Sequence, residues 1–301
     1  MWDRSGSDGL PILPITSDAC FQGIGDVDSD GVEDLVIGYS GPSEFLVIEG
    51  SKDFGSGSAV VLSGRDGSVL HEVRPESDAL AFGSCASELG DVNGDSIPDF
   101  AVGAPRRQLA TKGPGGAVYV CSGADGAILR RISSSGSEEF GHAVAGLQDM
   151  DGDAVSDLAV ASRPATGGSE VLVYSSLSGE VLYGVSGVED RFGAAIAPTG
   201  DVNGNGVPDF AIGSPAEDAE GARDCGMVCV YDGRKGEKIF SLLGSGPFAE
   251  LGALVEVLEN AEGPALFGSG HPRIPGRAQG DVVLRRSRRR IRGRDGSCPS
   301  A

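Results

Sequence analysis

Four short segments of the chain carry oxygen-bearing side chains at the same offsets. They begin at residues 26, 91, 149 and 201, and each has Asp or Asn at its first, third, fifth and ninth positions. The side chains are Asp26, Asp28, Asp30, Asp34, Asp91, Asn93, Asp95, Asp99, Asp149, Asp151, Asp153, Asp157, Asp201, Asn203, Asn205 and Asp209. The seventh position is expected to add a backbone carbonyl oxygen, from Val32, Ile97, Val155 and Val207.

Such oxygen-rich sets suit calcium, a hard cation that takes about six to eight oxygen ligands. Zinc is disfavoured because no His or Cys joins any of the four segments. The sequence therefore predicts up to four Ca²⁺ sites. The alternative is a set of turns whose carboxylates only cap backbone amides, but turns do not require carboxylates at identical offsets. The fourth segment has two formal charges, so the weakest site is expected there.

The residues that follow these segments exclude an EF-hand. That loop needs Glu at its twelfth position. Here the twelfth position is apolar in every copy, with Ile37, Val102, Val160 and Ile212. Each of these residues belongs to a continuous apolar run of strand length, so the segments are predicted to connect strands rather than helices.

Each acidic segment lies inside a larger repeating unit. Phe-Gly pairs precede the second, third and fourth segments by nine residues, at Phe82, Phe140 and Phe192. After each segment come a buried strand and a Gly-containing hairpin, which gives about four strands per unit. A fifth, degenerate unit is predicted to begin at Phe248 and to lack the metal-binding set. Its loop positions are Val257, Glu259, Ala261 and Ala265.

Four-stranded units cannot bury both faces alone and must stack around an axis. We therefore predict an all-β fold, a β-propeller with about five visible four-stranded blades, as one domain over residues 1–297. The repeats are expected at about 17–75, 76–135, 136–187, 188–243 and 244–297, followed by a tail at 298–301. Residues Leu10 to Thr16 are predicted to close the ring as the missing outer strand. An incomplete propeller cut from a longer chain is the alternative.

The repeated motifs also carry a family resemblance. Phe-Gly, then D-x-[DN]-x-[DN]-x-x-x-D, then GAP or GSP resembles the FG-GAP repeat of integrin α-chain N-terminal propellers and related bacterial proteins. The second copy fits best, with Phe82-Gly83 followed by Gly103-Ala104-Pro105. The resemblance extends from about Ala19 to Ser297. It implies calcium loops on one face of a propeller and a role in binding or adhesion.

Composition narrows the classes of partner. The chain has 44 acidic and 24 basic residues, a formal net charge of −20, which argues against a nucleic-acid surface. No apolar run reaches the roughly 18 residues of a membrane helix. The Arg-rich segment 285–294 is interpreted as a solvated edge or irregular extension of the fifth unit, with a nucleic-acid signal as the alternative. Six cysteines without a C-x-x-C pair leave disulfide bonding open.

No catalytic residue is assigned, because the three His residues lie outside any known catalytic spacing and no G-x-S-x-G or P-loop motif occurs. We expect a non-catalytic module that binds a protein or glycan. The alternatives are a hydrolase or lyase with its active site opposite the calcium loops, and a structural repeat of a larger surface protein. Calcium loading favours an extracellular, periplasmic or cell-surface location, although no signal peptide is visible.

Overall fold

The computed structural model describes residues 19–40, 57–75, 79–107, 115–133, 139–163, 168–187, 191–219, 222–260, 263–269 and 282–285. Within these ranges every regular element is a β-strand. The described residues form no helix able to cross a membrane. The predicted closing strand at 10–16 and most of the Arg-rich segment lie outside the described residues, so both interpretations stay predictions.

Four sheets have four antiparallel strands each, and every sheet is a simple meander in chain order. The first contains β1 Ala19–Gly23, β2 Leu35–Tyr39, β3 Ser58–Leu62 and β4 Val69–Val73. The second contains β6 Cys85–Gly90, β7 Asp99–Ala104, β9 Ala117–Cys121 and β10 Ile128–Ile132. The third contains β11 Val144–Gly146, β12 Leu158–Ser162, β13 Glu170–Tyr174 and β14 Val181–Ser186. The fourth contains β15 Ala195–Gly200, β16 Asp209–Ser214, β17 Met227–Tyr231 and β18 Lys238–Leu243.

Two smaller sheets complete the described structure. A three-stranded sheet contains β19 Leu254–Asn260, β20 Gly263–Ser269 and β21 Val282–Arg285. A short pair joins β5 Ala79–Leu80 to β8 Arg106–Arg107. The predicted four-strand unit is thus confirmed for the first four copies.

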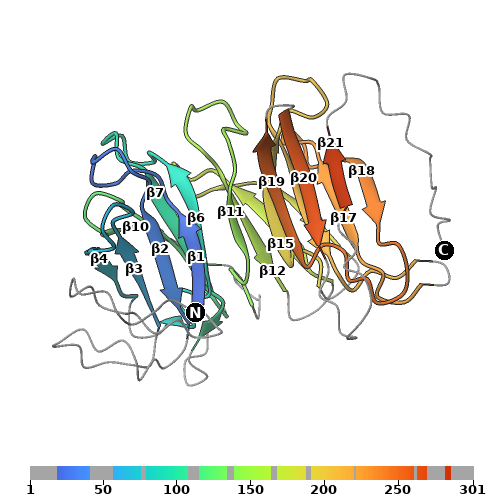
Figure 1. The fold of residues 1–301 in the computed structure, drawn as a ribbon, viewed down its shortest axis with the longest axis horizontal. Coiled ribbons are helices and arrows are strands. Elements are labelled where there is room, and N and C mark those ends of the chain that lie inside the picture. The colour runs from blue at the N-terminus through green and yellow to red at the C-terminus, as the bar shows by residue number, and fades with distance from the viewer. Residues whose placement is uncertain are drawn as a thin grey trace.

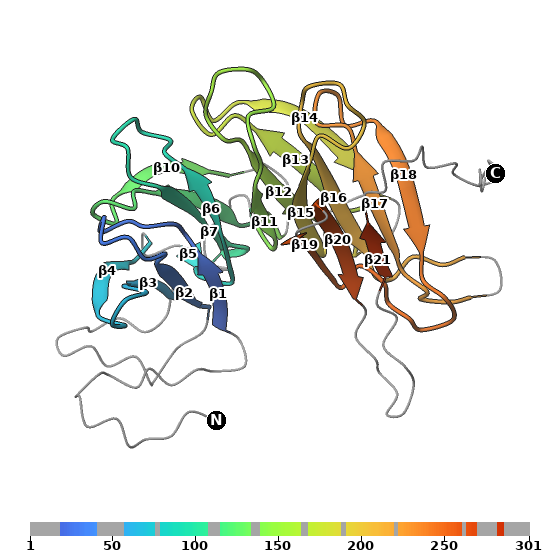
Figure 2. The same ribbon diagram turned by 45° about the horizontal axis from the view of Figure 1, so that its top comes forward.

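The sheets stand side by side in chain order, as the colour gradient of Figures 1 and 2 shows. Their first strands make the contacts between sheets: β1 packs against β6, β6 against β11, β11 against β15, and β15 against β19. This stacking of sheets by their first strands is that of propeller blades. The fold is therefore the all-β propeller of four-stranded blades that the sequence predicts, and the domain boundaries stay a prediction.

The Phe of each Phe-Gly pair fixes the seam between two blades. Phe82, Phe140 and Phe192 are buried, and each ring meets a tyrosine of its own blade edge-on, with ring centroids 5.3 to 6.4 Å apart. Phe82 also forms a parallel bridge to Gly57 of the preceding blade. Burial of such rings supplies much of the apolar stabilisation of the seam.

The two glycines of the motif allow the blades to approach. Gly103 follows the second loop, and a Cβ there would overlap the carbonyl oxygen of Gly141 in the next blade. Gly213 stands against Gly252 in the same way. Gly141 and Gly252 have φ of +85° and +95°, a conformation that favours glycine. Backbone therefore packs on backbone at these two seams.

Two predictions for the fifth unit are wrong, namely its Phe-Gly position and its loop positions. In the fifth unit Leu251-Gly252 takes the Phe-Gly place, because Leu251 is 1% exposed and bridges to Gly226, whereas Phe248 is 42% exposed. Val257 and Glu259 lie inside β19, which turns back into β20 between Asn260 and Gly263. The fifth unit has a tight hairpin where the others have an acidic loop.

In the first unit, Phe21 lies within β1 and is 48% exposed. It pairs with Ile37 of β2. Cys20 of β1 pairs with Gly38, just as Cys85 of β6 pairs with Gly103. Cys20 therefore corresponds to Cys85, and Phe21, which follows Cys20, is not the equivalent of Phe82, which precedes Cys85.

Candidate metal centres

The four acidic loops have the same place in the fold. Each connects the first strand of a sheet to the second: β1 to β2, β6 to β7, β11 to β12, and β15 to β16. The first strand lies at the seam between blades and the second is buried, with Asp99–Ala104 and Asp209–Ser214 buried throughout. The loops are therefore anchored at both ends by rigid elements.

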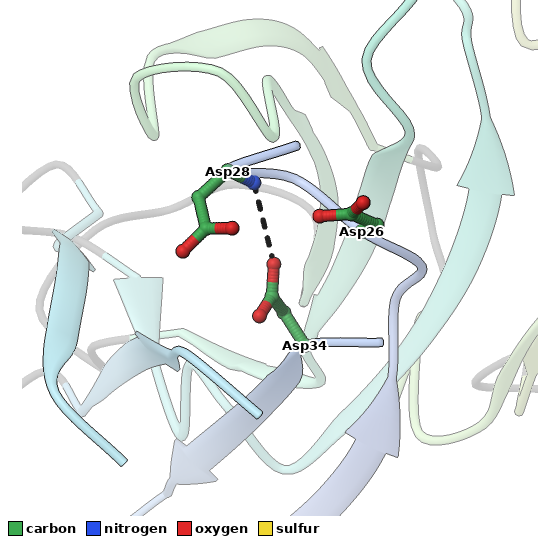
Figure 3. Close-up of side chains that lie close together, drawn as sticks. All are labelled: Asp26, Asp28 and Asp34. Carbon is green, nitrogen blue, oxygen red and sulfur yellow. Dashed lines mark hydrogen bonds between the residues drawn. The ribbon is translucent and has the colours of Figure 1, made fainter. Parts of the chain in front are cut away.

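The first loop gathers three carboxylates. Asp26, Asp28 and Asp34 place one oxygen each within 4.8 Å of the others (Figure 3). Asp26 accepts hydrogen bonds from the backbone N–H groups of Asp30 and Gly31, at 3.0 and 2.8 Å. These bonds wind the loop around its own first side chain, which leaves the carboxylates facing one another.

Asp30 does not join that cluster. Its Oδ2 pairs with Nε of Arg65 at 2.5 Å, and Arg65 also donates to the Asp30 carbonyl oxygen. The hydrogen bond from Arg65 lowers the pKa of the Asp30 carboxyl. Desolvation, and then the charges of Asp30 and Asp34, raise the pKa of Asp28. Arg65 thus pairs directly with Asp30 and acts on the charges of Asp26 and Asp28 from farther away.

The third loop repeats the cluster with Asp149, Asp151 and Asp157, again within 4.8 Å. Asp153, at the fifth position, accepts instead from the N–H of Val155 at 2.8 Å. The second and fourth loops have Asn at the third position, so this trio of carboxylates does not form there. Their backbone turns are nevertheless the same, since Asp91 and Asp201 accept the N–H groups of Ser96 and Gly206.

The ninth position is the most strongly held of all. Its Asp is fully buried in every loop, and its Oδ2 accepts the N–H of the residue at position two. In three loops its Oδ1 accepts a further N–H from a glycine in the hairpin turn between the third and fourth strands. These donors are Gly64 at 2.9 Å, Gly123 at 3.1 Å and Gly233 at 3.1 Å.

The third loop lacks that last bond. Among the described residues Asp157 Oδ1 is buried without a hydrogen-bond partner, and so is the hydroxyl of Ser176. Ser176 has the place of the hairpin glycine. A Cβ on Gly64 or Gly233 would overlap the carbonyl oxygen at loop position eight. We infer that the Ser176 side chain keeps its own N–H away from Asp157.

Burial acts strongly on the Asp157 carboxyl. Burial, followed by the charges of Asp151, Asp153 and Asp149, raises its pKa to about 7. The single N–H of Met150 opposes that rise. Asp99 and Asp209 have pKa values raised in the same direction by burial, but each is opposed by three backbone N–H groups. A buried carboxylate oxygen without a donor is costly unless a cation or proton meets it.

The residues present therefore fit a hard cation at two of the four loops. In those two loops the carboxylates of positions one, three and nine lie together, and that of position five lies outside the group. Sequence reasoning missed Arg65, the hairpin glycines and Ser176, because they act from about 20 to 35 residues away along the chain. A signal was present in the sequence: when the hairpin turns are aligned, Ser176 occupies the position that is Gly64, Gly123 and Gly233 in the other three blades. The predicted carbonyl ligands and the identity of the ion stay predictions.

A cavity of about 520 Å³ lies beside the loops, at the ends of β6, β11 and β15. Its polar lining comes from Glu88, Gln148, Ser156 and Thr199, and it contains no His or Arg. Ser156 belongs to the third loop itself. The cavity is thus on the loop side of the blades and does not provide the separate catalytic pocket that the enzyme alternative requires.

Comparison with known proteins agrees with the repeat pattern. The FG-GAP repeat model matches residues 87–121 and 192–230. Integrin alpha-PS2 of Drosophila melanogaster is 33% identical over 230 residues, which cover 66% of this chain and 15% of that protein. Integrin alpha-V of Gallus gallus is 27% identical over 213 residues, which cover 70% of this chain and 15% of that protein. The chain therefore spans only a small part of the length of these relatives.

A solved structure, that of rhamnogalacturonan lyase YesW, is similar with a TM-score of 0.52 and 15% identity. It covers 89% of this chain and 48% of that one, and at this identity the likeness concerns the fold alone. The family match falls in the second and fourth blades, where Phe-Gly and GAP or GSP are complete. The chain therefore contains FG-GAP repeats, which are similar to those of integrin α chains.

Proposed function

We propose that the chain is a non-catalytic, calcium-loaded binding module that works outside the cytoplasm. The observation that carries the calcium part is the third loop. It sets three carboxylates within 4.8 Å of one another and leaves the buried Asp157 Oδ1 without a donor among the described residues. Oxygen atoms in this arrangement are the ligands of a hard cation.

Calcium would supply the positive charge that these carboxylates lack. The first loop would hold it through Asp26, Asp28 and Asp34, and the third through Asp149, Asp151 and Asp157. In both loops, backbone N–H groups donate to the Asp side chain at position one, and the fold buries the Asp at position nine. Positions five and seven, and the second and fourth loops, are weaker candidates for the same role.

Likeness to integrin α chains supports a role in adhesion or binding, and it also supports an extracellular location. Loops of modest affinity would also stay empty at the low free calcium of a cytoplasm. A protein or glycan is the proposed partner class. The lyase alternative rests on shared fold, which does not transfer an activity, and the cavity beside the loops offers it no His or Arg.

The test is calcium counting by equilibrium dialysis on the full chain, together with thermal melts in millimolar calcium and in chelator. Asp28→Asn and Asp151→Asn should each remove about one tightly bound ion and most of the calcium-dependent rise in Tm that belongs to that loop. Asp125→Asn is the matched control, because Asp125 is in a hairpin turn and accepts only the N–H of Ala127. Absence of bound calcium in the wild type, with equal melts in both buffers, would refute the calcium proposal.

The binding role is tested separately. Full chain immobilised on a surface should retain glycans or cell-surface proteins in calcium and release them in chelator. Equal retention by a chain whose clusters carry both Asp28→Asn and Asp151→Asn would show that the loops do not support binding.

A further inference from the structure

The fourth loop is poor in charge for a calcium site. Asp201 and Asp209 are its two carboxylates, and Asn203 and Asn205 occupy the third and fifth positions. Asn203 and Asn205 donate their side-chain N–H groups to a carboxylate that lies outside the loop motif. The acceptor is Oδ2 of Asp232, at 2.6 Å from Asn203 Nδ2 and 2.5 Å from Asn205 Nδ2.

Asp232 begins the hairpin turn that follows β17. Its Oδ1 accepts the N–H of Arg234 at 2.9 Å, so the carboxylate is fixed in orientation by its own turn. The other three hairpins have serine at this place, Ser63, Ser122 and Ser175. Ser63 and Ser122 accept the same turn bond, from the N–H groups of Arg65 and Ala124, whereas Ser175 accepts from Ser178, one residue further on. Among these four described hairpins, the second carboxylate oxygen is thus an addition of the fourth blade.

The amide oxygens of the fourth loop are already engaged. Asn203 Oδ1 accepts the N–H of Asn205, and Asn205 Oδ1 accepts the N–H of Val207. The amide nitrogens, which cannot bind a cation, point to Asp232. Asp209 accepts from Val202, Asn203 and Gly233, so the described part of this loop has no buried oxygen without a partner.

We propose that Asp232 is an internal anionic latch, which holds residues 201–209 closed without a metal ion. The hydrogen-bond polarity is opposite to that of a cation site: donors converge on one carboxylate, instead of carboxylates converging on one cation. Charge-assisted bonds of this kind are among the stronger ones in proteins. Asp232 is therefore a positioning residue for the fourth loop, and the third loop remains the copy that needs a cation.

Hydrogen exchange measured by mass spectrometry on the full chain tests this proposal. In chelator, the peptide over residues 201–209 should exchange at least about tenfold more slowly than the peptide over 149–157, because the latch replaces the cation. Calcium should slow exchange in the third loop and leave the fourth nearly unchanged. Equal exchange of the two loops in chelator, or equal protection of both by calcium, would overturn the latch.

Asp232→Ser is the matched variant, since it installs the residue of the other three hairpins and keeps the turn bond. It should speed exchange of residues 201–209 about tenfold in chelator while the third loop stays as in the wild type. Unchanged exchange in this variant would overturn the proposal. Fewer bound calcium ions in Asp232→Ser than in wild type would also overturn it, because Asp232 would then be a metal ligand.

A further variant tests whether the fourth loop can be converted into a loop that responds to calcium. Asn203→Asp, Asn205→Asp and Asp232→Ser together recreate the carboxylate pattern of the third loop, and residues 201–209 should then gain protection from calcium. The latch proposal rests on the proposed function in one respect only, which is the comparison of the fourth loop with a calcium-binding third loop. If no loop responds to calcium, the calcium proposal fails; the latch is still supported when Asp232→Ser alone loosens the fourth loop.

Discussion

The third and fourth loops have the same backbone course and opposite chemistry. In the third, three carboxylates face one another and a buried oxygen of Asp157 has no donor among the described residues. In the fourth, Asp209 has its donors and the two Asn side chains bind Asp232. The difference teaches that one repeat motif can either bring carboxylates together or bind its amide side chains to an added carboxylate. The motif letters alone do not decide which.

The largest expected effect comes from replacing the Asp at the ninth position of each loop, and it should differ between the two loops. Asp209→Ala removes the acceptor of three backbone N–H groups and should lower the free energy of unfolding by roughly 3 kcal/mol or more, equally in calcium and in chelator. Asp157→Ala should be costly in calcium and much milder in chelator. Denaturant unfolding in both buffers measures this, and parallel behaviour of the two variants would erase the distinction.

Calcium itself should act mainly through the first and third loops. At a concentration near 100 times the dissociation constant, each occupied site adds about 2.7 kcal/mol to the free energy of unfolding. Asp151→Asn should therefore remove about that amount in calcium and little in chelator. Asn203→Ser, at the equivalent place in the fourth loop, should leave the calcium-dependent gain intact; thermal melts in the two buffers compare them.

Ser176→Gly should make the third loop resemble the others by supplying an N–H to Asp157 Oδ1. We expect a gain of about 1 kcal/mol in chelator, after the entropic cost of glycine. The wild type in chelator should also lose stability as pH rises from about 4 to about 7. The reason is that Asp157, with its pKa raised to about 7, still binds a proton when the unfolded chain has released it.

The same variant should flatten that pH dependence, because the new N–H lowers the pKa of Asp157. Unfolding curves collected at several pH values in chelator provide the measurement. A slope identical to that of the wild type would mean that Ser176 does not control the Asp157 carboxyl.

The smallest effect concerns the first loop. Arg65→Met removes a cation that pairs with Asp30 and stands beside the carboxylate cluster. Calcium affinity of this loop should rise roughly twofold to fivefold, as expected for an exposed ion pair. Calorimetric titration of the variant against wild type checks this, with Arg234→Met as the control in the fourth loop. A weaker affinity would mean that Arg65 supports the site instead of competing with it.

The sequence was sufficient for the blade pattern, because alternating apolar runs, Phe-Gly pairs and hairpin turns are local signals. It also predicted that the acidic segments would be loops between strands, whereas the metal-ligand set of those loops stays a prediction. It could not predict that Arg65 would pair with Asp30, or that Ser176 would leave Asp157 Oδ1 without a hydrogen-bond donor among the described residues. Those contacts join residues brought together only by the fold of a whole blade.

The error in the fifth unit has a similar origin. Phe248 and Leu251 both precede a glycine-containing turn, and the aromatic type of Phe248 favours it as the Phe-Gly position. The structure buries Leu251 instead, because the place beside Gly226 accepts an apolar side chain of either kind. Burial, rather than aromatic character, defines that position.

The glycine contacts at the seams have a consequence for how such a chain can change. Gly103 meets Gly141 and Gly213 meets Gly252 through main-chain atoms, so these joints make little demand on side-chain shape. At these two glycine contacts, exchange of a blade would therefore require no matching side-chain substitution in its neighbour. The third seam, where Ala161 faces Gly193, already departs from two bare glycines and is expected to be the least interchangeable of these three.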